Sequence, residues 1–192
     1  VFFTFAENCI RLIDNFLAPI SNRNSLHELP NFKMYSWKEG MRRLENKHLD
    51  KMGGNFPFQC LNERTDVVQL PVSQKENAKV AIQEILQEIF NIFSKNLTQS
   101  AWDGTSIVRF QNGLYQQIQR LEACLRAQME KELTNPESED LQLTSRRVKQ
   151  YFQGIDAFLK EKQFSLCAWE IIRMEIPRCF VLIDKLTRSL SN

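Results

Sequence analysis

The sequence is short of the residues that interrupt helices. Its 192 residues include only 6 glycines and 6 prolines. An all-β sandwich of this length would need a turn about every 8–12 residues, so the scarcity of turn residues favours long helices. No uncharged apolar run approaches about 18 residues, so we expect no membrane insertion. The net charge is only +2, and without a basic tail the sequence gives no sign of nucleic-acid binding.

The chain also lacks the groupings that catalysis and metal binding require. A di-iron carboxylate site needs paired Glu-x-x-His motifs on separate helices, and only Glu45–His48 fits, because the other histidine is His27. No two cysteines have zinc-site spacing, and no phosphate-binding or G-x-S-x-G motif occurs. A cysteine and a histidine that meet only in space stay an open alternative. We therefore predict no enzyme activity, no metal and no cofactor, and binding through the surface.

Apolar residues recur at spacings of three or four in five segments, which predicts five helices. The stripes contain Trp37, Met41, Leu44, His48 and Met52; Ala78, Ile82, Ile85, Ile89 and Ile92; Ile107, Phe110, Leu114, Ile118, Leu121 and Leu125; Val148, Phe152, Ile155 and Leu159; and Trp169, Ile172, Ile176, Phe180, Ile183 and Leu190. Long loops are predicted at 54–73 and 132–142. Two long crossovers favour an up-up-down-down arrangement, so the predicted fold is an all-α, five-helix bundle.

Two features bear on secretion. Residues 1–33 are apolar in part, but charged residues interrupt the core that a signal peptide needs, namely Glu7, Arg11 and Asp14. Either a signal peptide was removed before Val1 or none was present. We predict an N-terminal extension of unassigned role at 1–33 and a helical domain at 34–192. The one glycosylation sequon makes Asn96 the predicted glycan site.

The segment CAWEIIRMEIPRCF, at 167–180, combines core and surface features. At 100° per residue its apolar stripe centres near Ile176. A neighbouring flank holds Arg173, Met174, Pro177, Arg178 and Val181. Arginine beside exposed apolar groups is typical of interface centres, although a solvated helix side with incidental apolar residues fits as well. Because Pro177 cannot bond to the carbonyl of Arg173, we predict a kink that changes the relative aim of the two arginines.

This segment resembles the last-helix signature of the type I interferons, C-A-W-x-I/V-V/I-R-x-E-I-x-R. Five further segments resemble that family in order and spacing: CLNERTDVVQLP (60–71), EILQEIFNIF (84–93), SAWD (100–103), LYQQIQRLEACL (114–125) and VKQYFQGIDAFLKEKQFSLCAW (148–169). The resemblance covers about residues 34–190. It implies a secreted, monomeric cytokine with the helical-bundle fold. It also implies that the protein bridges two different receptor chains and so triggers Janus kinase signalling and an antiviral response.

The resemblance also implies roles for the five cysteines. The family ties its first long loop to the start of its last helix, which implies a disulfide between Cys60 and Cys167. Alpha-like members have a second bridge that ends at the position of Cys124, but the usual N-terminal partner position holds no cysteine here. A Cys9–Cys124 bridge and a free Cys124 are therefore both open. Cys179 falls on the core face and is expected to be a buried thiol.

Two receptor-binding surfaces are implied in the same way. The surface for the high-affinity chain would contain Leu61, Arg64, Arg173, Met174, Arg178 and Val181, with Arg64 as the leading anchor. The surface for the low-affinity chain would contain Phe90, Asn91, Tyr115 and Lys149. The chain departs from the family pattern at Asn62, Thr65, Pro177, Ser106 and Gln111. The weaker match of the second surface and the unassigned N-terminal segment keep an alternative open, namely a receptor-binding antagonist that does not signal, or another helical-bundle binding protein.

Overall fold

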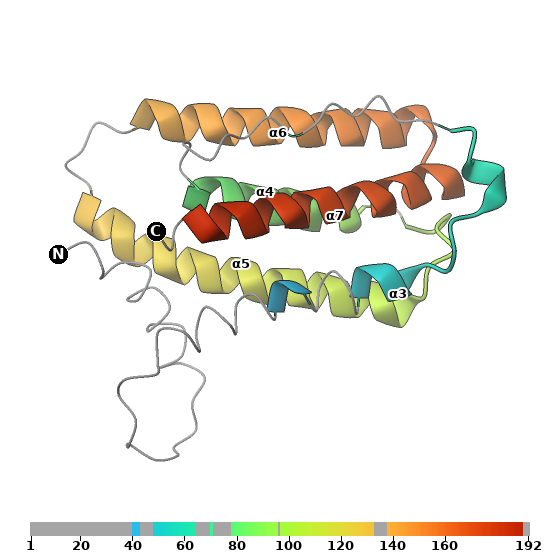
Figure 1. Cartoon of the computed structure of the whole chain (residues 1–192), viewed down its shortest axis with the longest axis horizontal. Helices are drawn as coiled ribbons and strands as arrows, with labels where there is room; N and C mark the ends of the chain where they lie inside the picture. The colour runs from blue at the N-terminus through green and yellow to red at the C-terminus, as the bar shows by residue number, and fades with distance from the viewer. Residues whose placement is uncertain are drawn as a thin grey trace, which may run out of the picture.

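The computed structural model describes residues 40–42, 48–63, 70, 78–95, 97–132 and 138–189, with only the backbone at 123–132 and 138–141. The elements are α3 (Asp50–Met52), the short 3-10 helix η2 (Phe58–Cys60), α4 (Ala78–Phe93), α5 (Gly104–Glu132), α6 (Ser138–Glu161) and α7 (Leu166–Ser189). Every element that the structure describes is helical, which confirms the predicted all-α class (Figure 1).

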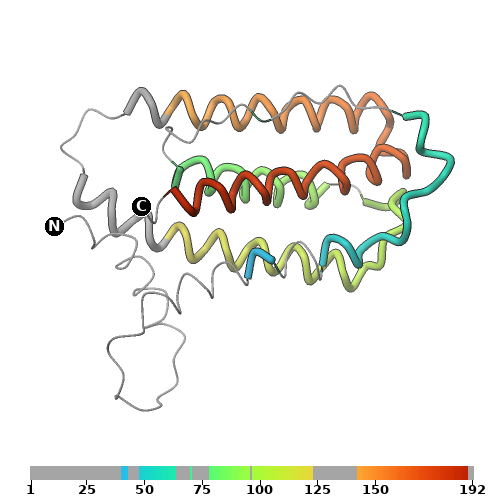
Figure 2. The backbone as a smooth tube through the Cα atoms, viewed as in Figure 1, coloured from blue at the N-terminus to red at the C-terminus, as the bar shows by residue number. Residues whose placement is uncertain are grey.

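The four long helices form an elongated bundle in which neighbours along the chain alternate in direction. α4 and α6 run one way, and α5 and α7 run the other way (Figures 1 and 2). α3 and η2 lie near the end of the bundle where α4 finishes, whereas α4 begins at the opposite end. The end of η2 and the start of α4 therefore lie at opposite ends of the bundle, as a long first crossover requires.

α4 is the central helix, because it contacts α5, α6 and α7. Its apolar stripe is wide enough for this position. Eight of its 16 residues are buried: Ala78, Ala81, Ile82, Ile85, Leu86, Ile89, Ile92 and Phe93. A helix that meets partners on three sides needs a broader apolar face than a surface helix, and the remaining side of α4 faces solvent.

Aromatic rings close the core at the end of the bundle where α7 begins. The ring of Phe93 lies 5.7 Å from that of Trp102, 4.9 Å from that of Phe110 and 6.2 Å from that of Trp169. These residues come from α4, the start of α5 and the start of α7, so one cluster fixes three segments relative to each other. Truncating a buried aromatic residue to alanine costs about 3–5 kcal/mol.

The second predicted long loop, at 132–142, is shorter than the pattern indicated. α5 continues to Glu132 and α6 begins at Ser138, so residues 138–142 are helical and the loop prediction is wrong there. The acidic run after Pro136 suits a helix start, since serine and carboxylate side chains satisfy free N–H groups and favour the positive end of the helix dipole.

α5 also begins later than the predicted start near Ser100. Asp103 caps the helix, because its Oδ2 accepts a hydrogen bond from the backbone N–H of Ser106 at 2.7 Å. The bonds from Ser106 lower the pKa of Asp103. Trp102, just before the cap, is buried. The start of α5 is thus set by a capping residue, whereas the apolar period alone places it a few residues early.

α7 is one helix on both sides of Pro177. The predicted stripe residues Trp169, Ile172, Ile176 and Phe180 are buried, as periodicity indicated. The bend at Pro177 stays a prediction. Arg173 and Arg178 nevertheless differ greatly in environment, and the cause is their contacts with other elements, described below.

Candidate functional site

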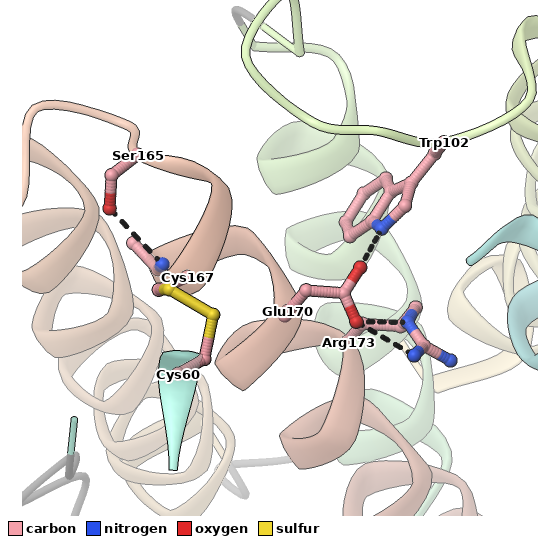
Figure 3. The surroundings of a disulfide bond; sticks show 7 residues. Cys60, Trp102, Ser165, Cys167, Glu170 and Arg173 are labelled. Carbon is pink, nitrogen blue, oxygen red and sulfur yellow. Dashed lines mark hydrogen bonds and ion pairs between the residues drawn. A yellow bond between two sulfur atoms is a disulfide. The ribbon is translucent and has the colours of Figure 1, made fainter. Parts of the chain in front are cut away.

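A disulfide joins the first long loop to the last helix. The sulfur atoms of Cys60 in η2 and Cys167 in the first turn of α7 are bonded at 2.01 Å, and the two cysteines are 107 positions apart in sequence (Figure 3). Next to it, Ser165 caps α7 by accepting a hydrogen bond from the N–H of Ala168 at 3.3 Å. The predicted Cys60–Cys167 bridge is confirmed, and it fixes η2 beside the start of α7.

A buried polar cluster provides a second link between the same two regions (Figure 3). Glu170 Oε1 accepts a hydrogen bond from Trp102 Nε1 at 2.5 Å. Its Oε2 accepts from Arg173 Nη2 at 2.7 Å and from Arg173 Nε at 3.1 Å. Arg173 Nη2 also donates to the carbonyl oxygen of Gly54 at 3.0 Å. The cluster ties α7 both to the start of α5 and to the residues that lead into η2.

Arg173 is therefore not part of the exposed flank to which the helical period assigned it. Only 6% of the residue is exposed, so the prediction of an exposed Arg173 is wrong. A long side chain at the border of the apolar stripe can turn inward or outward, and here Glu170 and Gly54 hold it inward. Close packing at this point also explains Gly53, since a Cβ atom there would lie 2.7 Å from Arg173 Nε.

Three further residues of the predicted flank are exposed, whereas Pro177 is half-buried. Met174, Arg178 and Val181 follow Cys167 by seven, eleven and fourteen residues, close to whole numbers of helical turns. They therefore share the face of α7 that carries the disulfide. Met174 and Val181 are exposed apolar residues, and the Arg178 side chain is 73% exposed. The structure thus places these three predicted residues on one surface.

η2 adds two apolar side chains at the disulfide end of this surface. Leu61, a predicted site residue, is 58% exposed, and Phe58 is 91% exposed. The reasoning from sequence did not select Phe58, because it belongs to no helical stripe. Its signal was its place two residues before Cys60. Phe58, Leu61, Met174, Arg178 and Val181 together are called the loop–α7 surface below.

The predicted second surface lies on the solvent side of α4 and its neighbours. The rings of Phe90 on α4 and Tyr115 on α5 are 6.4 Å apart, so these two residues are brought together. Asn91 accepts a hydrogen bond from Gln87 at 3.3 Å. Lys149 Nζ on α6 lies 3.7 Å from Glu84 Oε1 on α4. Glu84 is two turns before Asn91, so the two residues share one face of α4.

The structure adds one residue to this second surface and gives the position of another. Val108 is exposed two turns before Tyr115 on α5 and was not selected from sequence. Gln111, where the chain departs from the family pattern, donates a hydrogen bond to the Phe93 carbonyl oxygen at 2.7 Å. Because α4 and α7 pack against each other, their exposed sides face away from each other. Phe90, Asn91, Tyr115, Val108 and Lys149 are called the α4–α6 surface below.

Several predicted residues lie outside the described part of the chain. These are Cys9, Arg64 and Asn96, and only the backbone of Cys124 is described. Their roles as a bridge, a receptor anchor and a glycan site stay predictions, as does the boundary at residue 33.

Cys179 is a buried thiol, as predicted. It is 1% exposed, and its Sγ donates to Tyr151 Oη at 3.8 Å. Burial raises the pKa of Cys179 to about 12. A thiol that is neutral and shielded from solvent is chemically inert, so its role is in packing between α6 and α7.

Within the described ranges, no three His, Cys, Asp or Glu side chains are grouped so as to hold a metal ion. None of the helices described there combines the length and apolar character of a membrane span. The described features are a stapled helical bundle and two exposed surfaces, each with apolar and polar side chains. Such a bundle, which presents rigid helix faces, is typical of the class of helical-bundle cytokines.

Comparison with known proteins agrees with this class and identifies the family. A model of the interferon alpha/beta domain matches residues 37–190. Interferon beta of Tachyglossus aculeatus aculeatus is 38% identical over 149 residues, which cover 74% of this chain and 77% of that protein. Interferon alpha-2 of Equus caballus is 37% identical over 169 residues, which cover 85% of this chain and 84% of that protein. The chain belongs to the interferon alpha/beta family.

Solved structures agree on the fold. Zebrafish interferon 2 superposes with a TM-score of 0.61 at 23% identity, covering 79% of this chain and 97% of that one. Zebrafish interferon 1 superposes with a TM-score of 0.59 at 21% identity, covering 81% of this chain and 99% of that one. The protein is thus a type I interferon-like cytokine, a signalling protein rather than an enzyme.

Proposed function

We propose that this cytokine is secreted and bridges two different chains of the interferon receptor, which triggers Janus kinase signalling and an antiviral response. The loop–α7 surface binds the high-affinity chain, and the α4–α6 surface binds the low-affinity chain. The observation that carries the proposal is the presence of two exposed surfaces on opposite sides of one rigid bundle. A ligand can hold two receptor chains together only if it presents two sites that do not overlap.

The composition of the loop–α7 surface supports its assignment to the tighter contact. Phe58, Leu61, Met174 and Val181 are exposed apolar side chains, and Arg178 adds a charge among them. Aromatic residues, methionine and arginine are enriched where protein interfaces are buried most deeply. The Cys60–Cys167 bridge holds the loop part against α7, so less ordering is required when a receptor binds.

Replacing Leu61 and Arg178 together by alanine is expected to weaken binding to the high-affinity chain by about 2 kcal/mol or more, roughly 30-fold in Kd. The reason is the loss of an apolar contact and a charged anchor from one surface. Surface plasmon resonance with the purified receptor ectodomain measures this directly.

The matched control is Lys160→Ala. Lys160 lies on α6, its side chain is 66% exposed, and it pairs with Asp156 one turn earlier, so this change removes an exposed, ion-paired cation that lies on neither α7 nor η2. Its removal should change binding by less than about 0.5 kcal/mol. Equal losses for the two variants, or none for the double variant, would show that the high-affinity chain binds elsewhere.

Replacing Tyr115 by alanine is expected to reduce signalling in interferon reporter cells while leaving binding to the high-affinity chain unchanged. Tyr115 is exposed and contributes an aromatic contact with Phe90, and truncating an interface aromatic residue costs about 1–2 kcal/mol or more. Dose–response curves and binding to each ectodomain are measured in parallel. If the unmodified protein bound the receptor without signalling, the antagonist alternative would replace this proposal.

A further inference from the structure

A buried carboxylate lies directly beneath the charged group of the loop–α7 surface. Glu175 is buried, and its two oxygens have separate partners. Oε2 pairs with Arg178 Nη1 at 3.1 Å. Oε1 accepts a hydrogen bond from Tyr151 Oη at 3.0 Å. The carboxylate thus connects an exposed arginine on α7 to a buried tyrosine on α6.

The tyrosine is itself held firmly. Tyr151 is buried, and its ring packs edge-on against Phe152 with centroids 5.0 Å apart. Its hydroxyl accepts the contact from Cys179 Sγ at 3.8 Å. Burial, with smaller effects from Cys179 and Glu175, raises the pKa of Tyr151 far above its ordinary range. The hydroxyl therefore stays protonated at physiological pH, and it can donate to Glu175 throughout that range.

The geometry leaves the outer part of Arg178 accessible to a partner. Nη1 takes part in the pair with Glu175, while 73% of the side chain is exposed. A guanidinium has five N–H donors in a planar fork, so a receptor carboxylate or carbonyl oxygen can be bound beside the internal pair. Ordering a long side chain is one of the costs of association. If an arginine is already held in place in the free protein, it loses less conformational entropy when the receptor binds.

We infer that Tyr151 and Glu175 are positioning residues for Arg178, so that packing between α6 and α7 sets the affinity of the loop–α7 surface for the high-affinity receptor chain. This inference rests on the proposed function, since it assumes that Arg178 contacts that chain. Tyr151 and Glu175 are buried and do not touch the receptor. They affect binding only through Arg178.

The test is a double-mutant cycle measured as affinity for the purified high-affinity ectodomain. Tyr151→Phe removes only the hydroxyl, and Glu175→Gln removes only the charge. Each alone is expected to raise Kd about fivefold, because Arg178 is no longer held. In an Arg178→Ala background, the same changes are expected to alter Kd less than about 1.5-fold, since the residue through which they act is gone.

Controls separate this role from a general loss of stability. Asp184→Asn removes a carboxylate that pairs with an arginine elsewhere on α7, and it should leave the affinity unchanged. Thermal unfolding of each variant shows whether the protein remains folded at the assay temperature. A merely structural role predicts that the effect of Tyr151→Phe persists in the Arg178→Ala background, and that outcome would overturn the inference.

The remaining outcomes are also distinguishable. If Arg178→Ala weakens binding while Tyr151→Phe and Glu175→Gln do not, the inference fails and the proposed surface stands. If Arg178→Ala itself has no effect on binding, Arg178 does not contact the high-affinity chain. Both its assignment to that surface and the inference are then wrong. Fivefold losses that vanish in the Arg178→Ala background would support both.

Discussion

Replacing Cys60 and Cys167 together by serine is expected to lower the free energy of unfolding by about 4–5 kcal/mol. The bridge spans 107 residues of sequence, and in the chain-entropy model a loop of this length restricts the unfolded chain strongly. Urea unfolding followed by circular dichroism measures the change. A loss of this size is a large part of the typical stability of a domain, about 5–15 kcal/mol.

The same change should weaken receptor binding beyond its effect on stability. η2 carries Phe58 and Leu61, and without the bridge its described tie to α7 is reduced to packing and to the bond from Arg173 to Gly54. Reduction of the unmodified protein with dithiothreitol provides the control, since it breaks the bridge without changing the sequence. A double variant whose unfolding free energy stays within about 1 kcal/mol of the unmodified value would contradict the entropic argument.

Replacing Arg173 by alanine is expected to destabilise the protein by about 3–5 kcal/mol. The change would leave the Glu170 carboxylate buried without its cation, and it would remove the donor to the Gly54 carbonyl. Breaking one partner of a buried ion pair is costly, because the remaining charge has lost its solvation and its compensation. Thermal and urea unfolding measure the effect.

Arg178→Ala is the matched comparison, because it removes the same side chain five residues later in the same helix. Arg178 is mostly exposed, so its removal lets water reach the Glu175 oxygen that it leaves, and the other oxygen keeps its hydrogen bond from Tyr151. We expect a loss of about 1–2 kcal/mol, because one oxygen of a buried carboxylate loses its partner without being sealed from solvent. We therefore expect the two variants to separate: Arg173→Ala mainly lowers stability, and Arg178→Ala mainly lowers receptor affinity. A second variant, Arg173→Met with Glu170→Gln, should recover part of the stability, since replacing both charges removes the unpaired one. Equal unfolding curves for the two alanine variants would refute this division.

Much of the fold follows from apolar period alone. The stripes that contain Ile82, Phe110, Val148 and Trp169 become the buried faces of α4, α5, α6 and α7. Periodicity succeeds there because each long helix buries one continuous face against the others. It was less reliable at helix ends. The start of α5 at Gly104 depends on the cap from Asp103 rather than on period. α6 begins at Ser138, ten residues before the first residue of its predicted stripe, Val148.

The Cys60–Cys167 bridge was predicted from the family resemblance rather than from spacing, and it is present. The exposed Phe58, in contrast, could not be predicted from either periodicity or the resemblance. Its exposure depends on how η2 is held beside α7, and a loop residue carries no periodic signal that would indicate this.

The sequence by itself determined that the chain forms long amphipathic helices, which residues of each helix enter the core, and which family it resembles. Only the tertiary structure decided the fates of Arg173 and Arg178, five positions apart on one flank. Arg173 and its partner Glu170 are held by Gly54 and Trp102, which are 119 and 68 positions away from them in sequence. Arg178 is held at the surface through Glu175 by Tyr151 on another helix. Helical period describes which way a Cα–Cβ bond points, but the direction of a long charged side chain depends on the partners that the fold brings to it.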